Sequence, residues 1–158
     1  MKHHFKFENY EPDLFIEHIQ NSIPNYKGMR EMIPSIASNF LVENTNIYDI
    51  GCSAGDLLIE LEQTFRSVHD NLSYIGYDKA GNLLPKGNGV VDFFQRDITE
   101  DRLTMFNTSL VFSLFTLQFL PLDKRAKVVQ KIYDSLDKRG ALIVCEKITA
   151  KHGLTEDI

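Results

Sequence analysis

The sequence contains no tryptophan, only two cysteines and no apolar run that approaches the roughly eighteen residues needed to cross a membrane. Cys52 and Cys145 are too few and too far apart for a disulfide framework or a zinc site, so we expect reduced thiols, no bound metal and a cytoplasmic location. Basic residues never exceed two in a row, and the net charge is -5. We therefore expect neither a membrane nor nucleic acid as a direct partner.

The apolar content is sufficient for one folded core. Hydrophobic residues make up 43% of the 158 residues and charged residues 25%, which excludes general disorder. A chain of this length typically forms one domain. We predict a single domain over residues 1–158, with an N-terminal helical cap over residues 1–44 and a core over residues 45–147.

Hydrophobic spacing predicts two helices in the cap, over residues 14–23 and 29–42, and then strands that alternate with helices. Strands are expected over residues 46–50, 72–78, 90–94, 109–115 and 141–147. Helices are expected over residues 55–65 and 122–139, the second ended by Gly140 and with an apolar face at Ala126, Val129, Ile132, Tyr133 and Leu136. Residues 79–89 hold three glycines and a proline, so at most one helical turn is expected there. The predicted fold class is α/β, a Rossmann-like, doubly wound, mostly parallel sheet preceded by helices.

The motif Gly-Cys-Ser-Ala-Gly, residues 51–55, fits two chemistries that both need a strand before it and a helix after it. As G-x-S-x-G it is the nucleophile elbow of serine hydrolases, with Ser53 as nucleophile and His69 or His152 as base. However, only helices are expected before this turn, whereas the hydrolase fold places several strands there and takes oxyanion-hole donors from one of their loops. The hydrolase hypothesis is therefore disfavoured.

The alternative is a glycine turn that holds a nucleotide-like cofactor. Asp49 lies just before the turn, and Gly51 and Gly55 let the backbone approach a ligand closely. Asp78 and Asp97 end the next two predicted strands, where acids face the crevice in which doubly wound sheets bind ligands. The spacing G-x-x-x-G lacks the second glycine of the nicotinamide motif, but an S-adenosylmethionine site, which holds no pyrophosphate, tolerates this spacing.

Four segments carry a closer resemblance: SIPNYKGM (22–29), YDIGCSAGDL (48–57), RDI (96–98) and FTLQFLPLDKRAKVVQKIYDSLDKRGALIVCEKIT (115–149). Together they resemble the carboxy-S-adenosylmethionine synthase family, a branch of the class I S-adenosylmethionine-dependent methyltransferase superfamily formerly labelled tRNA methyltransferases. The resemblance runs from about residue 24 to residue 147. It implies a transferase that converts S-adenosylmethionine and prephenate to carboxy-S-adenosylmethionine, which serves the modification of wobble uridine in tRNA.

The resemblance implies a site for S-adenosylmethionine, carboxy-S-adenosylmethionine or S-adenosylhomocysteine, and it identifies no catalytic residue. Tyr26 is expected at the methionine or sulfonium end, Asp78 at the ribose, and Asp97 with Ile98 at the adenine. The full set of expected cofactor-binding residues is Tyr26, Asp49, Gly51, Cys52, Ser53, Gly55, Asp78, Asp97, Ile98 and Leu114. The expected partner is a small-molecule substrate, with prephenate as the candidate.

Three features depart from the family. Leu114 stands where the family has an asparagine that contacts the cofactor, and the crossover after Asp78 is shorter by roughly two helical turns. The family's remaining strands, and the arginine that binds the transferred carboxylate, lie beyond Ile158, so we expect the C-terminal strands to be missing or shortened. Two further functions stay open: an ordinary methyltransferase acting on a small molecule or RNA, and a non-catalytic binding module. The strand over residues 141–147 would be a bare apolar edge, so we expect a homodimer or other self-association.

Overall fold

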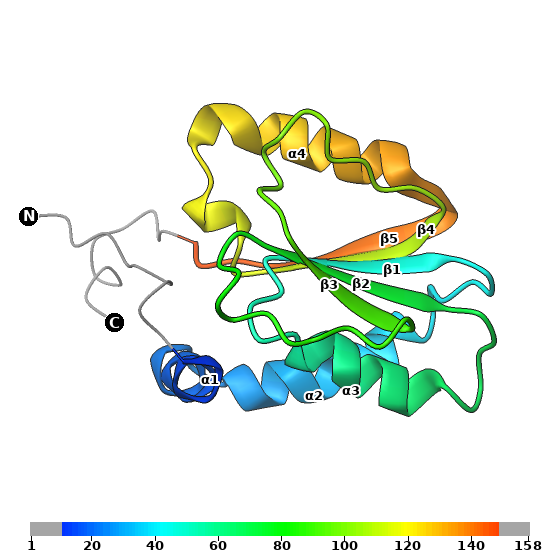
Figure 1. Cartoon of the computed structure of the whole chain (residues 1–158), viewed down its shortest axis with the longest axis horizontal. Helices are drawn as coiled ribbons and strands as arrows, with labels where there is room; N and C mark the ends of the chain where they lie inside the picture. The colour runs from blue at the N-terminus through cyan, green and yellow to red at the C-terminus, as the bar shows by residue number, and fades with distance from the viewer. Residues whose placement is uncertain (1–10, 149–158) are drawn as a thin grey trace, which may run out of the picture.

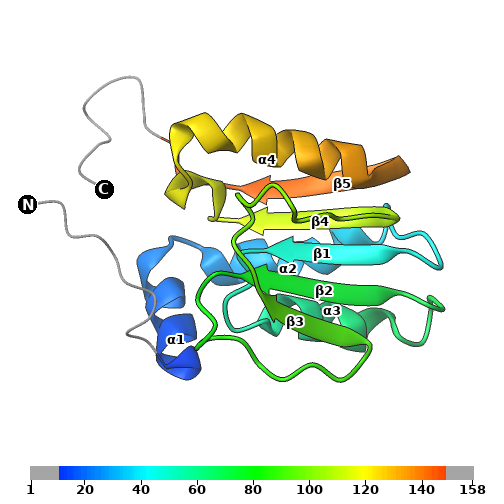
Figure 2. The ribbon, with the colours of Figure 1, turned by 45° about the horizontal axis from the view of Figure 1, so that its top comes forward.

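The computed structural model describes residues 11–148, and a five-stranded parallel sheet forms its centre (Figure 1). In spatial order the strands are β3 (Val91–Gln95), β2 (Ser73–Asp78), β1 (Asn46–Ile50), β4 (Thr108–Leu114) and β5 (Leu136–Cys145). Every neighbouring pair is parallel, so the carboxyl ends of all the strands lie on one edge of the sheet (Figure 2). The predicted α/β fold class is confirmed.

Helices cover both faces of this sheet. α2 (Tyr26–Ala37) and α3 (Asp56–Phe65) lie on one face, and α4 (Leu122–Ser135) lies on the other (Figure 1). Successive residues of a strand point to opposite faces, and β1 shows this directly. Its Ile47 packs in the cluster under α2 and α3, whereas Tyr48 packs in the cluster under α4. β1 and β4 are therefore buried between two apolar layers.

α1 (Pro12–Ser22) lies beside the carboxyl edge of the sheet (Figure 2). Its buried Phe15 packs with Ala80 and Leu83, which belong to the connection between β2 and β3. That connection contains no helix over residues 79–90, as its glycines and proline predict. A crossover without a helix leaves room at this edge, and the first helix of the chain packs there.

The boundary between α4 and β5 differs from the prediction. α4 ends at Ser135, and β5 begins at Leu136, which pairs with Thr108. Gly140 is therefore not a helix stop. A Cβ atom at Gly140 would lie 2.9 Å from the carbonyl oxygen of Thr108, so the glycine permits close passage of β5 beside β4. Sequence spacing missed this boundary because the pairing with β4, which ends the helix, is not a local property.

The predicted apolar face of α4 is also partly wrong. Ile132 is buried as expected, but its companion on the sheet side is Val128. Val129 is 40% exposed and Tyr133 is 72% exposed. The sequence of α4 contains two adjacent apolar stripes, one through Val128 and Ile132 and the other through Val129 and Tyr133. The stripe through Val128 packs against Tyr48 and Val111 of the sheet.

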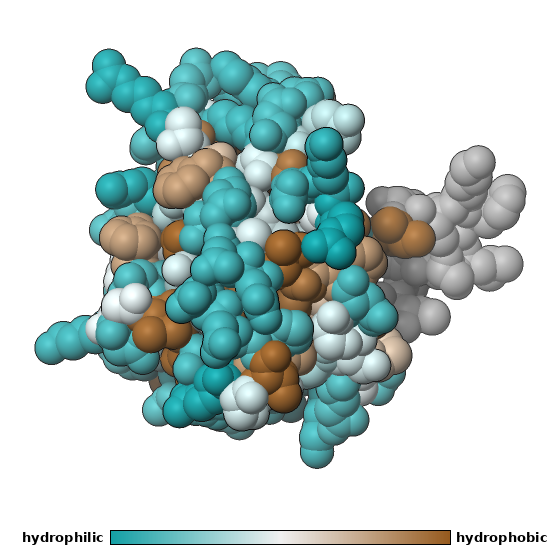
Figure 3. Space-filling model, turned by 90° about the vertical axis from the view of Figure 1, so that its right-hand side faces the viewer, coloured by the Kyte–Doolittle hydropathy of each residue, from teal (hydrophilic) through white to brown (hydrophobic). Residues whose placement is uncertain are grey.

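The two ends of the molecule differ in their surface. At the end where the strands begin, apolar side chains lie in small groups separated by polar ones (Figure 3). The large cavity described below lies at the other end. Within residues 11–148, no helix is both long and apolar enough to span a membrane.

Candidate functional site: a crevice at the carboxyl ends of the strands

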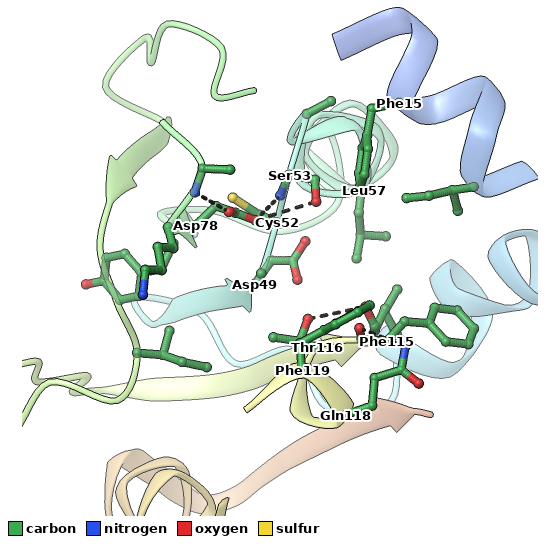
Figure 4. A pocket seen from close by; sticks show the side chains of 18 of the residues that line it. Phe15, Asp49, Cys52, Ser53, Leu57, Asp78, Phe115, Thr116, Gln118 and Phe119 are labelled. Carbon is green, nitrogen blue, oxygen red and sulfur yellow. Dashed lines mark hydrogen bonds between the residues drawn. The ribbon is translucent and has the colours of Figure 1, made fainter. Parts of the chain in front are cut away.

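A cavity of about 760 Å³ opens at the carboxyl ends of β1, β2 and β4 (Figure 4). This volume lies in the range of about 300–1,000 Å³ that is typical of small-molecule sites. Its walls come from α1, α2, the turn after β1, the ends of β2 and β3, and the loop after β4. The topology places it where doubly wound sheets bind their ligands, because β1 and β4 are neighbours whose crossovers run through α3 on one face and α4 on the other (Figure 1).

The turn after β1 is held in an unusual backbone conformation. Gly51, Ser53 and Gly55 have φ values of 77°, 49° and 71°, in the left-handed region that glycine adopts readily. The backbone N–H groups of Gly51 and Cys52 donate to the carbonyl oxygen of Tyr77, at 2.7 and 3.1 Å. The turn is thereby tied to the end of β2, and α3 begins immediately after it.

Asp78 completes this attachment. One carboxylate oxygen, Oδ2, accepts a hydrogen bond from the backbone N–H of Ser53 at 2.8 Å, and Oδ1 accepts one from the backbone N–H of Ala80 at 2.8 Å. Asp78 therefore holds both the glycine turn and the start of its own loop (Figure 4). Oδ1 still has a second lone pair for a ligand hydroxyl, whereas the Ser53 hydroxyl also lies 3.5 Å from Oδ2.

Asp97 is fixed in a similar way just after β3. Its Oδ1 accepts hydrogen bonds from the backbone N–H and the hydroxyl of Thr99, and its Oδ2 is 3.0 Å from the Lys79 ammonium nitrogen. Burial opposes its ionisation, but the Thr99 hydrogen bonds and Lys79 outweigh burial and lower the pKa of Asp97 to about 2. Asp97 is therefore a carboxylate at any physiological pH.

Asp49 is the exception among these acids. It is 4% exposed, and its carboxyl group accepts no hydrogen bond from another described residue. Its carboxyl group points into the space between Leu57 and Thr116 (Figure 4). Burial, followed by the nearby charge of Asp56, raises the pKa of Asp49 to about 8, although Arg30 opposes this shift. A cationic group bound in the cavity beside Asp49 would stabilise the deprotonated form of this carboxyl.

A buried arginine closes the cavity beside Tyr26. The Arg30 guanidinium contacts Asp56 at 2.5 Å and Glu60 at 2.7 Å, and its Nη1 donates to the Tyr26 hydroxyl at 3.3 Å. The guanidinium carbon also lies 5.9 Å from the centre of the Tyr26 ring. These contacts join α2 to the start of α3 and fix the Tyr26 side chain at the cavity wall.

A more apolar part of the cavity lining comes from α1 and the loop after β4. α1 contributes Phe15, Ile16, Ile19 and Ile23 at its end, and the loop contributes Phe115, Phe119, Leu120 and Pro121. Phe115 has a φ of 57° and its ring lies 6.4 Å from that of Tyr26, between centroids. The cavity thus has an acidic part near Asp49, Asp78 and Asp97 and an apolar part between α1 and the loop.

Nine of the ten predicted cofactor-binding residues line this one cavity: Tyr26, Asp49, Gly51, Cys52, Ser53, Asp78, Asp97, Ile98 and Leu114. Gly55 does not line it. Its left-handed backbone begins α3, and a Cβ atom there would collide with Phe93 behind the turn. Sequence reasoning missed Arg30, Thr116 and the apolar wall. Arg30 follows Tyr26 by one helical turn, which was the available signal.

The nucleophile-elbow hypothesis finds no support in this geometry. The Ser53 hydroxyl lies 3.5 Å from a carboxylate oxygen of Asp78, and no contact with a described histidine is present. His69 packs against Phe65, in the segment that follows α3, and His152 lies outside the described residues. Burial, and then Asp49, raises the pKa of the Cys52 thiol well above its usual value, so this cysteine is not a thiolate nucleophile either. Over residues 11–148, no cluster of three or more metal-ligating side chains occurs.

Solved structures of known proteins share this fold. No family model matches the chain. Among solved structures, it superimposes on the plantazolicin methyltransferase BpumL in complex with SAH with a TM-score of 0.61 at 14% identity, covering 84% of this chain and 51% of that one. A sugar N-methyltransferase, KedS8 from a Streptoalloteichus species, gives a TM-score of 0.60 at 14% identity, covering 85% and 53%. The fold is therefore that of the S-adenosylmethionine-dependent methyltransferases.

Sequence similarity is more specific. The chain is 32% identical over 151 residues to the carboxy-S-adenosyl-L-methionine synthase of Staphylococcus epidermidis, covering 91% of this chain and 63% of the relative. It is 30% identical over 153 residues to the synthase of that name from Idiomarina loihiensis, covering 91% and 62%. The predicted resemblance to this family is confirmed. The chain spans a little more than three fifths of the length of these relatives.

The first prediction concerns Gly51. A Cβ atom there would collide with the Thr116 side chain, whereas a Cβ atom at Gly89, which has a similar φ of 85°, meets nothing within 4 Å. Gly89→Ala should therefore lower the free energy of unfolding only by the cost of backbone strain, about 1–2 kcal/mol. Gly51→Ala should lower the free energy of unfolding by at least about 1 kcal/mol more, because Thr116 must move. Urea denaturation of both variants measures this, and equal losses would show that Thr116 does not constrain the turn.

Proposed function

We propose that the chain binds S-adenosylmethionine in this crevice and acts as a transferase similar to the carboxy-S-adenosylmethionine synthases. The observation that carries the proposal is Asp49, a buried carboxyl group that faces the cavity without a hydrogen-bond donor among the described residues. The bound cofactor would supply a sulfonium centre activated for group transfer, together with an ammonium group. A buried carboxyl beside that position stabilises positive charge.

The remaining acids suit the nucleoside. Asp78 and Asp97 keep free lone pairs after binding their own loops, so Asp78 can accept from ribose hydroxyls and Asp97 from the adenine amino group. Ile98 is 6% exposed and offers an apolar contact to the adenine ring beside Asp97. Tyr26 and the turn at Gly51 would face the methionine part. S-Adenosylhomocysteine and carboxy-S-adenosylmethionine share the nucleoside and would bind in the same orientation.

For the second substrate we propose a small molecule with an apolar ring, and prephenate as its candidate. The ring would lie against the apolar wall formed by α1, Phe115 and Phe119. The carboxylates of prephenate need cations, and Arg30 and Lys79 at the cavity are already ion-paired with Asp56 and Asp97. Arg96 also lines the cavity, and its Nη1 donates to the carbonyl oxygen of Gln95 at 3.0 Å without an ion pair to a described residue. A carboxylate could therefore pair with Arg96 without opening either of these ion pairs.

We also propose a kind of partner and a cellular location for the chain. The net charge of -5 and the scattered basic residues favour a small-molecule partner over direct nucleic-acid contact. The two free cysteines are compatible with work in the reducing cytoplasm. Any role in tRNA modification would then be through a small-molecule product.

The test of cofactor binding uses the titration of Asp49. Because its pKa of about 8 is raised by burial, the carboxyl is protonated below that pH in the free protein. A cationic ligand favours the carboxylate, so binding should release a proton. The affinity for S-adenosylmethionine should therefore increase between about pH 5.5 and 7.5, by up to tenfold per pH unit. Calorimetry in buffers of different ionisation enthalpy measures both the affinity and the proton.

The matched variant is Asp49→Asn, which keeps the shape and cannot ionise. It should bind more weakly at pH 7.5 and lose the proton release. Detectable binding with no proton release in the parent protein would show that Asp49 does not face the cation. No binding of S-adenosylmethionine at any pH would contradict the proposed function itself.

We also propose that the chain self-associates through β5. This strand pairs only with β4 among the described strands, so its outer edge carries unpaired backbone groups (Figure 2). Ile143 packs against the core under α2 and α3, whereas Val144 is 51% exposed. Val144 is therefore the residue through which the edge can be tested without damage to the core.

Val144→Lys should shift the protein toward monomer, because a lysine discourages strand pairing at a sheet edge. The control is Val68→Lys, since Val68 is 65% exposed just after α3, far from β5 in the sheet order. Sedimentation velocity over a dilution series measures the species present. A parent protein that is monomeric at every concentration would refute self-association.

A further inference from the structure

The loop after β4 forms much of the apolar wall, and its conformation is not one that its sequence favours. Leu114, Phe115, Thr116, Gln118, Phe119, Leu120 and Pro121 all line the cavity. Phe115 has a φ of 57°, which costs about 1–2 kcal/mol for a bulky residue. Such a backbone persists only where the surrounding structure compensates for it. The compensation comes from two charged side chains outside the cavity.

Glu146, which follows β5 directly, binds the loop from its N–H side. Its Oε1 accepts hydrogen bonds from the backbone N–H groups of Thr116 at 3.1 Å and Leu117 at 2.7 Å. Its Oε2 accepts one from the backbone N–H of Gln118 at 3.1 Å. A single carboxylate thus binds three successive backbone donors, and bonds of this charge-assisted kind are roughly twice as strong as neutral ones.

Arg125 binds the same loop from its carbonyl side. From α4, its Nε donates to the carbonyl oxygen of Leu120 at 3.1 Å and its Nη2 donates to that of Gln118 at 2.9 Å. Glu146 and Arg125 come from different elements and hold opposite ends of the short helical turn Leu117–Phe119. The turn therefore has little freedom to move relative to β5 and α4.

The loop in turn contacts the parts of the cavity that face the cofactor. Thr116 packs directly on Gly51, so closely that no Cβ atom fits at that position. The Phe115 ring lies 6.4 Å from the Tyr26 ring between centroids, and Phe119 also lines the cavity (Figure 4). A displacement of the loop would therefore change the walls beside Gly51 and Tyr26.

We propose that Glu146 and Arg125 are positioning residues, which hold residues 115–121 in the conformation that the cofactor crevice requires. Neither residue lines the cavity, so neither is expected to touch the ligand. The effect on binding rests on the proposed function. The effect on the loop can be measured in the free protein, so failure of one can be distinguished from failure of the other.

The loop is measured with a tryptophan reporter. The chain contains no tryptophan, so Phe119→Trp, at a position that is 56% exposed, gives an emission signal from the loop alone. In this background Glu146→Gln keeps the size of the side chain but loses the charge and one acceptor oxygen. We expect emission at longer wavelength and stronger quenching by acrylamide. The matched control is Glu43→Gln, an exposed glutamate before β1.

Binding is measured without the reporter. In the otherwise unmodified chain, Glu146→Gln should weaken S-adenosylmethionine and S-adenosylhomocysteine at least about tenfold, which corresponds to about 1.4 kcal/mol, while Glu43→Gln leaves the affinities unchanged. Arg125→Met should give the same direction in both measurements, and it replaces Glu146→Gln if that variant does not fold. Native emission and affinity that are unchanged in a folded variant, with only the free energy of unfolding reduced, would overturn the proposal. If the parent binds neither ligand, the proposed function fails, and unchanged reporter emission by itself still overturns the positioning role.

Discussion

The parallel sheet imposes one constraint on everything at its carboxyl edge. All five strands end there, so the loops that leave them carry backbone N–H groups that must find acceptors. Carboxylates at the strand ends supply them. Asp78 at the end of β2, Asp97 after β3 and Glu146 after β5 each accept at least one backbone N–H from the adjacent loops. The crevice is thus built from acids whose first task is to hold the loops that form its walls.

The Asp49 carboxyl group binds no loop N–H group among the described residues, so no such hydrogen bond offsets the burial that raises its pKa. Asp78 accepts backbone N–H donors, and Thr99 together with Lys79 lowers the pKa of Asp97 to about 2, whereas burial beside Asp56 raises the pKa of Asp49. The site therefore combines two acids that bind backbone donors with one acid that can exchange its proton for a ligand cation. In chemical terms, this combination fits a nucleoside that carries a sulfonium or ammonium group.

Sequence patterns predicted the fold class, the glycine turn and the acids Asp49, Asp78 and Asp97. The resemblance to the synthase family added five further expected residues: Tyr26, Cys52, Ser53, Ile98 and Leu114. Neither could show how the acids divide their roles, since Asp49 and Asp78 look equivalent in sequence but only Asp78 meets backbone donors. The boundary at Leu136 was missed because pairing with β4 overrides the helical pattern. Arg30 and Glu146 were missed because their partners lie 26 and 28–30 residues away in the chain.

We propose that this crevice retains an adenosyl sulfonium compound and presents it for transfer. The most direct measurement is mass spectrometry of the small molecules that remain with the protein after incubation with S-adenosylmethionine, with and without prephenate, followed by desalting. We predict that the nucleoside is retained in stoichiometric amount, and the proposed carboxyl transfer from prephenate would increase its mass by that of CO2. Recovery of protein with no nucleoside bound in either case would contradict the account.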